Sequence, residues 1–186
     1  YLLGIINNII ESNGRALIIT PTRELAKQVY DVATSICKYS TLKISLCVGG
    51  TDITSYHDNI VIGTVGRILH MTTIKKLDIS QLTVLVIDEA DNMLNENEND
   101  NHDLEYIMKT IPSKCQKILI SATLTHHVFQ FTDRTMVDPA KILLKNINVA
   151  VDIISQFYVD VEVEENKFDV LIDLYNLIST TQAIIF

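Results

Sequence analysis

The chain has 186 residues, and 15 Lys and Arg against 23 Asp and Glu give it a formal net charge of −8. Its hydrophobic content of 47% excludes disorder, and its apolar runs are far shorter than the roughly 18 residues that a membrane-spanning helix needs. We therefore expect a soluble protein of about one globular domain or slightly more, without membrane contact. The acidic charge argues against bulk capture of nucleic acid, so any nucleic-acid contact must be local.

The three cysteines, Cys37, Cys47 and Cys115, lie far apart in apolar surroundings. None belongs to a CxxC pair, and no histidine stands near them at metal-ligand spacing. We interpret them as reduced, buried residues of an intracellular protein rather than as a disulfide or zinc site.

Both ends of the chain have the patterns expected of a truncated chain. A helical pattern over residues 1–10 starts at Tyr1 without a preceding cap, with Leu2, Leu3, Ile6, Ile9 and Ile10 on its apolar face. At the other end, an apolar strand pattern over 182–186 stops without a turn signal. We expect a partial chain.

Between the ends, short apolar runs alternate with helical periodicities. Strands are expected at Ala16–Thr20, Lys43–Val48, Ile60–Gly63, Thr83–Ile87, Lys117–Ile120 and Lys141–Leu144. Helices are expected with one stripe of Leu25, Val29, Val32 and Ile36, another of Leu104, Ile107, Met108 and Ile111, and a third over His126–Met136. This rhythm predicts an α/β fold whose mostly parallel sheet is covered on both faces and binds ligands at the carboxyl ends of its strands.

The rhythm breaks at residues 145–152, where no helix separates two strand-like runs. Residues 155–163 then alternate in the manner of a strand, and Phe168, Leu171, Ile172, Tyr175 and Ile178 form a helical stripe. This tail is too short for an independent domain, so we expect it to be the opening of a second one.

The segment Val84 to Asp91 is the strongest local signal. Asp88 follows an apolar strand at the expected ligand edge, where phosphoryl-transfer ATPases place the acid that holds hydrated magnesium. Glu89 can orient or deprotonate a water for in-line attack on a terminal phosphate. The alternative is that Asp88, Glu89 and Asp91 are only acids that favour the start of the next helix.

Three further strand ends carry groups suited to phosphate. Pro21-Thr22-Arg23 opens a helix, Gly49-Gly50 follows the next strand, and Thr64-Val65-Gly66-Arg67 follows the one after that. Free amides, hydroxyls and arginines on one edge could form a track along a nucleic-acid backbone. Ordinary helix starts and turn chemistry would explain the same residues.

Ser121-Ala122-Thr123 also ends a predicted strand at this edge, where its hydroxyls could hydrogen-bond the carboxylates after Ile87. A phosphate-binding P-loop needs GxxxxGK followed by Ser or Thr, and none of the six glycines precedes a lysine. Without that loop, Asp88 and Glu89 have no properly held nucleotide, so we expect this chain alone to be inactive.

The order of these segments resembles the amino-terminal RecA-like domain of the DEAD-box RNA helicases. The tail after Ile154 is most similar to the translation-initiation-factor branch and its exon-junction relatives. The resemblance implies a RecA-like three-layer α/β/α domain over 1–146 that lacks the Q motif and P-loop. It also implies a linker over 147–154 and the truncated beginning of a carboxyl-terminal RecA-like domain over 155–186.

The resemblance further implies ATP as substrate, with Mg²⁺ held through water by Asp88 and the attacking water positioned by Glu89. Asp91, Ser121 and Thr123 would couple the ATP state to strand separation. The residues that would line the RNA sugar-phosphate track, without reading bases, are Pro21, Thr22, Arg23, Gly50, Thr64, Gly66 and Arg67. Val65 departs from the family pattern, which usually has Pro there.

The whole protein would then be an RNA-stimulated ATPase that unwinds RNA duplexes. We expect a monomer that binds RNA through its backbone, a scaffold protein that activates it, and a cytoplasmic location with the nucleus as the alternative. The competing interpretation is a truncated relative that binds RNA or a partner without catalysis. A third is an unrelated P-loop ATPase that shares only the strand ending in Asp and Glu.

Overall fold

The computed structural model describes residues 1–50, 58–94, 98–143, 155, 157–179 and 182–185. It divides into two compact units, Tyr1–Ala140 and Lys141–Phe186. The linker predicted at 147–154 lies outside the described residues, so the predicted domain boundaries stay a prediction.

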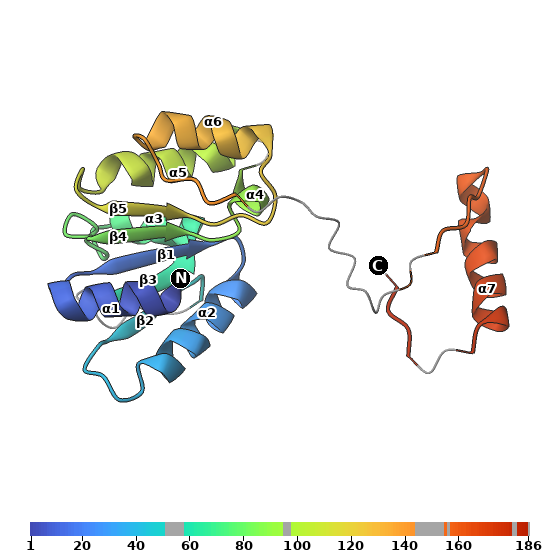
Figure 1. Ribbon diagram of the computed structural model, residues 1–186, viewed down its shortest axis with the longest axis horizontal. Helices are drawn as coiled ribbons and strands as arrows, with labels where there is room; N and C mark the ends of the chain where they lie inside the picture. Colours follow the sequence, from blue (N-terminus) through green and yellow to red (C-terminus); the bar gives the residue numbers. More distant parts are fainter. Residues whose placement is uncertain (51–57, 95–97, 144–154, 156, 180–181, 186) are drawn as a thin grey trace. The chain divides into compact units, whose positions relative to one another are not determined.

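The first unit is built on a sheet of five parallel strands in the order β2-β3-β1-β4-β5 (Figure 1). The strands are β1 (Ala16–Thr20), β2 (Ile44–Cys47), β3 (Ile60–Thr64), β4 (Val84–Ile87) and β5 (Gln116–Leu119). All five were expected, and their bounds agree with the prediction to within one residue. β1 and β4 lie in the middle and are buried on both faces, which explains their continuous apolar sequence.

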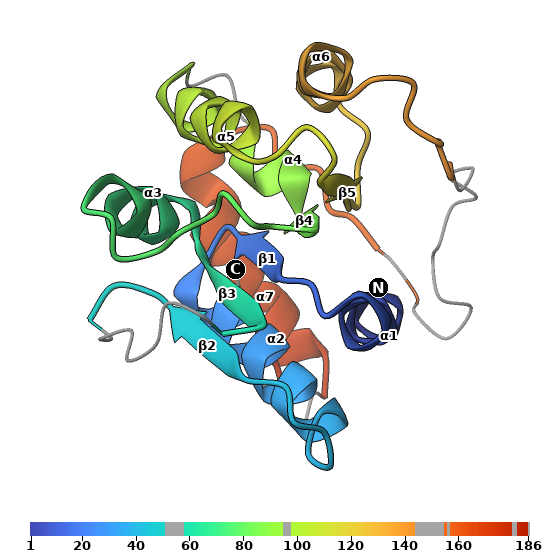
Figure 2. The ribbon, with the colours of Figure 1, turned by 90° about the vertical axis from the view of Figure 1, so that its left-hand side faces the viewer.

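Helices cover both faces of the sheet (Figure 2). On one face lie α1 (Leu2–Ser12) and α2 (Arg23–Ile36), and on the other lie α3 (Val65–Thr73), α5 (Glu98–Thr110) and α6 (His126–Thr135). A short helix, α4 (Ala90–Met93), follows β4. Alternate strand residues enter the two halves of the core, with Leu17 and Ile19 on one side and Ile18 on the other. The predicted three-layer α/β class is confirmed.

The buried face of α1 differs from the expected stripe. Ile5, Ile6 and Ile9 are buried, whereas Leu3 and Ile10 are 71% and 57% exposed. The helix is apolar over most of its circumference, so periodicity alone did not identify the side that packs on the sheet.

The face of α2 is also rotated from the prediction. Ala26, Val29 and Ala33 are buried, while Val32 and Ile36 of the predicted stripe are largely exposed. The two alanines lie fully buried, because small side chains let the helix approach the sheet closely. The prediction relied on large apolar residues, so it placed the buried face on the neighbouring stripe of α2.

Three strand predictions are wrong over the residues that the structure describes. Positions 141–143, the described part of 155–163, and 182–185 form no strand. Apolar residues in these runs, such as Ile142 and Phe157, are about nine-tenths exposed. A strand needs a hydrogen-bonded neighbour, and an apolar sequence pattern does not supply one.

The second unit contains the expected helix as α7 (Lys167–Leu177), preceded by the 3₁₀ turn η1 (Glu164–Asn166). None of the described α7 residues is buried, and Phe168, Ile172 and Tyr175 of the predicted stripe are exposed. The helix therefore presents an apolar stripe that the described part of this unit does not cover.

All three cysteines are buried with free thiols, as predicted. Burial raises the pKa of Cys47 and of Cys115 to about 11, so these thiols stay protonated near neutral pH. Among the described helices, none has the length and apolar character needed to cross a bilayer.

At Gly63 the backbone of β3 lies close to that of β2. A Cβ atom at this position would lie 2.1 Å from the carbonyl oxygen of Cys47 in β2, which is shorter than any allowed contact. We predict that Gly63→Ala lowers the free energy of unfolding by about 1–3 kcal/mol, because β2 must move away. Urea unfolding of the chain measures this loss.

Gly4→Ala is the matched control. Gly4 lies in α1 with nothing within 4 Å of the added Cβ, so alanine should stabilise by up to about 1 kcal/mol. Equal effects of the two substitutions would contradict the close approach at Gly63.

Candidate functional site

The carboxyl ends of all five parallel strands open on one edge of the sheet. Thr64 at the end of β3 pairs with Thr20 at the end of β1, and the Asp88 amide after β4 donates to the Ile19 carbonyl at 2.9 Å. Since neighbouring strands are about 4.8 Å apart, the backbones at Thr64 and Asp88 are separated by about 10 Å. The edge therefore brings the predicted acids and the predicted phosphate-binding turns together.

Asp88 is a buried carboxylate, with 9% of its surface exposed. Its Oδ1 accepts a hydrogen bond from the Glu89 amide at 3.0 Å, and its Oδ2 accepts one from the Tyr1 hydroxyl at 2.6 Å. Burial, followed by this hydrogen bond and the charge of Asp88, raises the pKa of Tyr1 above its ordinary value. In the sequence, Tyr1 is only the start of a helical pattern, and no local signal indicates this contact.

Glu89 has a left-handed backbone, with φ 50° and ψ 51°, directly before α4. Such a conformation costs a residue with a side chain about 1–2 kcal/mol. The Asn92 side chain one turn later donates a hydrogen bond to Glu89 Oε2 at 2.9 Å. The carboxylate of Glu89 is therefore held half-exposed at the edge by a strained backbone and a neutral donor.

Asp91 connects the end of β4 with the segment after β5. The hydroxyl and the amide of Thr123 donate to Asp91 Oδ2 at 2.6 and 2.9 Å, and the Ser121 hydroxyl donates to the Thr123 carbonyl at 2.6 Å. Burial raises the pKa of Asp91, but the hydrogen bonds from Thr123 outweigh this effect and hold the pKa below its ordinary value. The expected contact between these hydroxyl residues and the acids is made by Thr123 to Asp91.

The first arginine-bearing turn lies between β1 and α2. Thr22 caps α2, because its side chain accepts a hydrogen bond from the Leu25 amide at 3.1 Å. Pro21 therefore lies directly before the cap. A Cβ atom on Gly49 would lie 2.5 Å from Nη2 of Arg23, so this glycine leaves room for the guanidinium.

The second arginine-bearing turn is the start of α3. Thr64 precedes the helix, and Gly66 is exposed with open space around it. Arg67 Nη1 lies 3.4 Å from Nδ1 of His70 on the next turn. Val65 is the first residue of α3, where proline is favoured, and it packs against the core, so the helix begins there without proline.

Gly50 lies beyond β2 with φ 85°, a conformation suited to glycine. The predicted site residues of this edge thus follow the order of the strands. On one side lie, in strand order, Gly50, then Thr64, Gly66 and Arg67, then Pro21, Thr22 and Arg23. On the other side lie Asp88, Glu89, Asp91, Ser121 and Thr123.

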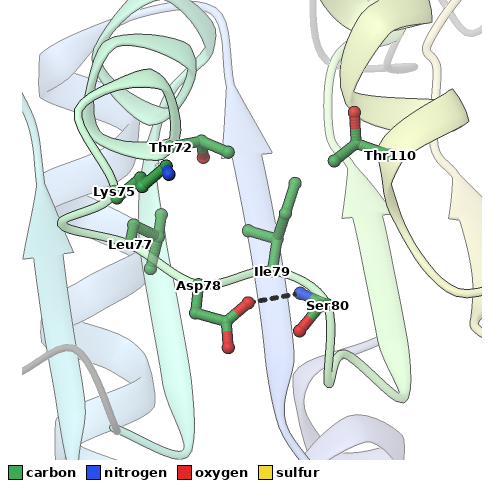
Figure 3. Close-up of a pocket in the computed structure, with 7 residues that line it drawn as sticks. All are labelled: Thr72, Lys75, Leu77, Asp78, Ile79, Ser80 and Thr110. Carbon is green, nitrogen blue, oxygen red and sulfur yellow. Dashed lines mark hydrogen bonds between the residues drawn. The ribbon is translucent and has the colours of Figure 1, made fainter.

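A separate hollow of about 290 Å³ lies at the opposite edge of the sheet (Figure 3). The residues that line it are Thr72, Lys75, Leu77, Asp78, Ile79, Ser80 and Thr110. Arg15, directly before β1, donates a hydrogen bond to the Asp78 carbonyl in this lining at 3.0 Å, which places the hollow near the amino ends of the strands. It is therefore distinct from the edge that carries Asp88.

The carboxylate oxygens of Asp88 are suitable ligands for magnesium. Mg²⁺ prefers carboxylate oxygens and usually keeps several of its waters, so it is bound by one or two carboxylates rather than by a full protein cage. Within the described ranges, no group of three or more His, Cys, Asp or Glu residues could hold a metal. A single buried carboxylate such as Asp88 suits a hydrated magnesium ion.

Comparisons with known proteins agree on one family. A family model described as DEAD/DEAH box helicase matches residues 1–131. The chain is 37% identical over 178 residues to eukaryotic initiation factor 4A of Caenorhabditis elegans, covering 92% of this chain and 44% of that protein. It is 38% identical to the ATP-dependent RNA helicase FAL1 of Kluyveromyces lactis, covering 92% of this chain and 45% of that protein.

Among solved structures, the chain is similar to Dbp5 of S. cerevisiae bound to RNA and ADP BeF3. The TM-score is 0.75 at 30% sequence identity, and the match covers 88% of this chain and 42% of that chain. The chain spans a little under half the length of the curated relatives it matches. With a family model over most of its length and relatives above 30% identity, the chain belongs to the DEAD/DEAH box helicase family.

Proposed function

We propose that the protein containing this chain is an ATP-dependent RNA helicase of DEAD-box type, in which RNA-stimulated ATP hydrolysis is coupled to duplex unwinding. The observation that supports this most is the shared edge, where buried Asp88 lies about 10 Å along the sheet from the turn that leads to Arg67. Acids for phosphoryl transfer and cations for an RNA backbone are neighbours on a rigid sheet.

In this proposal Asp88 would hold magnesium through water, and Glu89 would orient the attacking water and accept its proton. The water oxygen bonds to the terminal phosphorus as the bond to the leaving diphosphate breaks. When bound, Mg²⁺ supplies positive charge that offsets the charge developing on the phosphate oxygens. The left-handed backbone at Glu89 and the Asn92 hydrogen bond fix the direction of the carboxylate before the substrate arrives.

The RNA side of the edge uses few contacts. Amides, hydroxyls and two arginines from the residues Pro21, Thr22, Arg23, Gly50, Thr64, Gly66 and Arg67 would follow the sugar-phosphate backbone without reading bases. Local contacts of this kind let a chain with a net charge of −8 bind RNA.

Coupling between the two sides would pass through Asp91. Thr123 binds Asp91, which lies in the helix directly after Glu89, so a shift of α4 moves the segment from Ser121 to Thr123. A monomeric state, an activating scaffold protein and a cytoplasmic rather than nuclear location stay predictions.

The second candidate is a non-catalytic relative that binds RNA or a partner. A protein that lacks a loop of the form GxxxxGK followed by Ser or Thr cannot cradle the nucleotide phosphates in this way, and these 186 residues contain no such loop. The transcript discriminates between the two candidates. Codons for Gly-Lys-Thr immediately before Tyr1 favour the helicase, and a start codon there favours the binding module.

Glu89→Gln tests the catalytic role in the longest natural chain that contains these residues. Loss of the proton acceptor should lower RNA-stimulated ATP turnover about 100-fold or more, while RNA and ATP still bind. Phosphate release under saturating RNA measures turnover. Wild-type turnover in this variant would refute the assignment of Glu89.

Arg67→Ala tests the RNA track. Removing one phosphate contact should weaken binding of single-stranded RNAs of different sequence about equally and reduce the salt slope of log affinity by about 0.7. Lys114→Ala removes the same charge near the amino end of β5, at the opposite edge, and should leave both quantities unchanged. Fluorescence anisotropy at several salt concentrations gives both; a loss confined to one RNA sequence would argue against backbone binding.

Thr123→Val tests the contact between Thr123 and Asp91. The folded-state pKa of Asp91 is depressed, so its contribution to stability is present above the unfolded pKa of about 3.9 and is lost as the pH falls through the folded pKa. The variant should lose about 1 kcal/mol of unfolding free energy at pH 7 and progressively less as the medium is acidified below about pH 4.

Thr73→Val is its control, because the Thr73 hydroxyl donates only to a helix carbonyl, that of Leu69. Urea unfolding between neutral and acidic pH compares the two variants. A loss at Thr123 that does not change with pH would mean that the hydroxyl does not act through the charge of Asp91.

A further inference from the structure

The hydrogen bond from Tyr1 to Asp88 joins residues 87 positions apart in the sequence, at 2.6 Å. Tyr1 directly precedes α1, and its carbonyl accepts a hydrogen bond from the Ile5 amide at 3.1 Å. Ile5 and Ile9 are buried against the sheet, so the helix fixes the backbone from which the phenol reaches Asp88. The contact is therefore held by the packing of α1.

A buried carboxylate needs hydrogen-bond donors, and the kind of donor matters. A lysine or arginine would neutralise Asp88, whereas a phenol and an amide leave its negative charge intact. Tyr1 and the Glu89 amide bind different oxygens of the carboxylate, which fixes its plane. Each oxygen keeps a second lone pair that can accept a hydrogen bond from water.

We propose that Tyr1 is a positioning residue for the magnesium-binding carboxylate, and that its hydroxyl holds Asp88 in the orientation that receives the hydrated ion. The inference rests on the proposed function, in which Asp88 is that carboxylate. In this role Tyr1 acts through Asp88 rather than on the reacting phosphate. Donors behind a metal-binding carboxylate commonly change metal affinity 10–100-fold when they are removed.

Tyr1→Phe removes the hydroxyl and keeps the ring. The longest natural chain containing these residues is titrated with Mg²⁺ in the presence of a fluorescent ADP, and ADP affinity is also measured in EDTA. We expect the Mg²⁺ concentration at half-effect to rise about 10-fold, with metal-free ADP affinity unchanged. Tyr39→Phe makes the same change at a tyrosine that is 92% exposed and should leave the Mg²⁺ midpoint at its wild-type value.

Asp88→Asn separates failure of this inference from failure of the proposed function. If Asp88→Asn leaves the Mg²⁺ effect on ADP affinity intact, the metal role of Asp88 is wrong and both proposals fall. If Asp88→Asn abolishes the effect but Tyr1→Phe keeps the wild-type midpoint, only the role of Tyr1 is wrong. A lower midpoint in Tyr1→Phe also overturns that role, because the hydroxyl would then compete with the metal.

A double variant tests whether the effect of Tyr1→Phe passes through Asp88 or is a general structural effect. If Tyr1 acts through Asp88, adding Tyr1→Phe to Asp88→Asn should change the ADP affinity measured with Mg²⁺ no further. An additional loss of similar size in the double variant would show that Tyr1 acts independently of Asp88 and would overturn the inference.

Discussion

The parallel register of the five strands is the constraint on which the rest of the site depends. Parallel pairing sends every strand end to one edge, so turns that are distant in sequence become neighbours there. The order of the strands then separates the chemistry. β2, β3 and β1 end in glycine, hydroxyl and arginine turns, whereas β4 and β5 end in the acids and their hydroxyl partners. A shift of one strand by one residue would turn all of its side chains to the opposite face of the sheet.

Hydrogen bonds from uncharged donors hold the three acids that follow β4 at this edge. Asp88, Glu89 and Asp91 each accept at least one, from Tyr1, Asn92 and Thr123 respectively. Three acids within four residues repel one another, and a neutral donor lowers the energy of each without removing its charge. The packing of the sheet beneath, whose central strands are fully buried, offsets the free energy of this repulsion.

Much of this arrangement could be predicted from the sequence, because strands buried on both faces are apolar throughout and the acids follow them directly. The buried side of α2 could not, since Ala26 and Ala33 face the sheet and periodicity favours larger residues. Nor could the absence of strands at 141–143, because pairing depends on a neighbour that no local pattern encodes. The edge of the site was predictable from topology, but the contact of Tyr1 with Asp88 spans most of the first unit and has no local signal.

The left-handed backbone at Glu89 would set stability against the proposed role of this acid. Glycine adopts this conformation freely and would relieve about 1 kcal/mol of strain. A screen that selects variants by thermal tolerance alone would therefore favour replacing Glu89 with glycine. If Glu89 has the proposed role, only a screen that also selects for ATP hydrolysis would retain it.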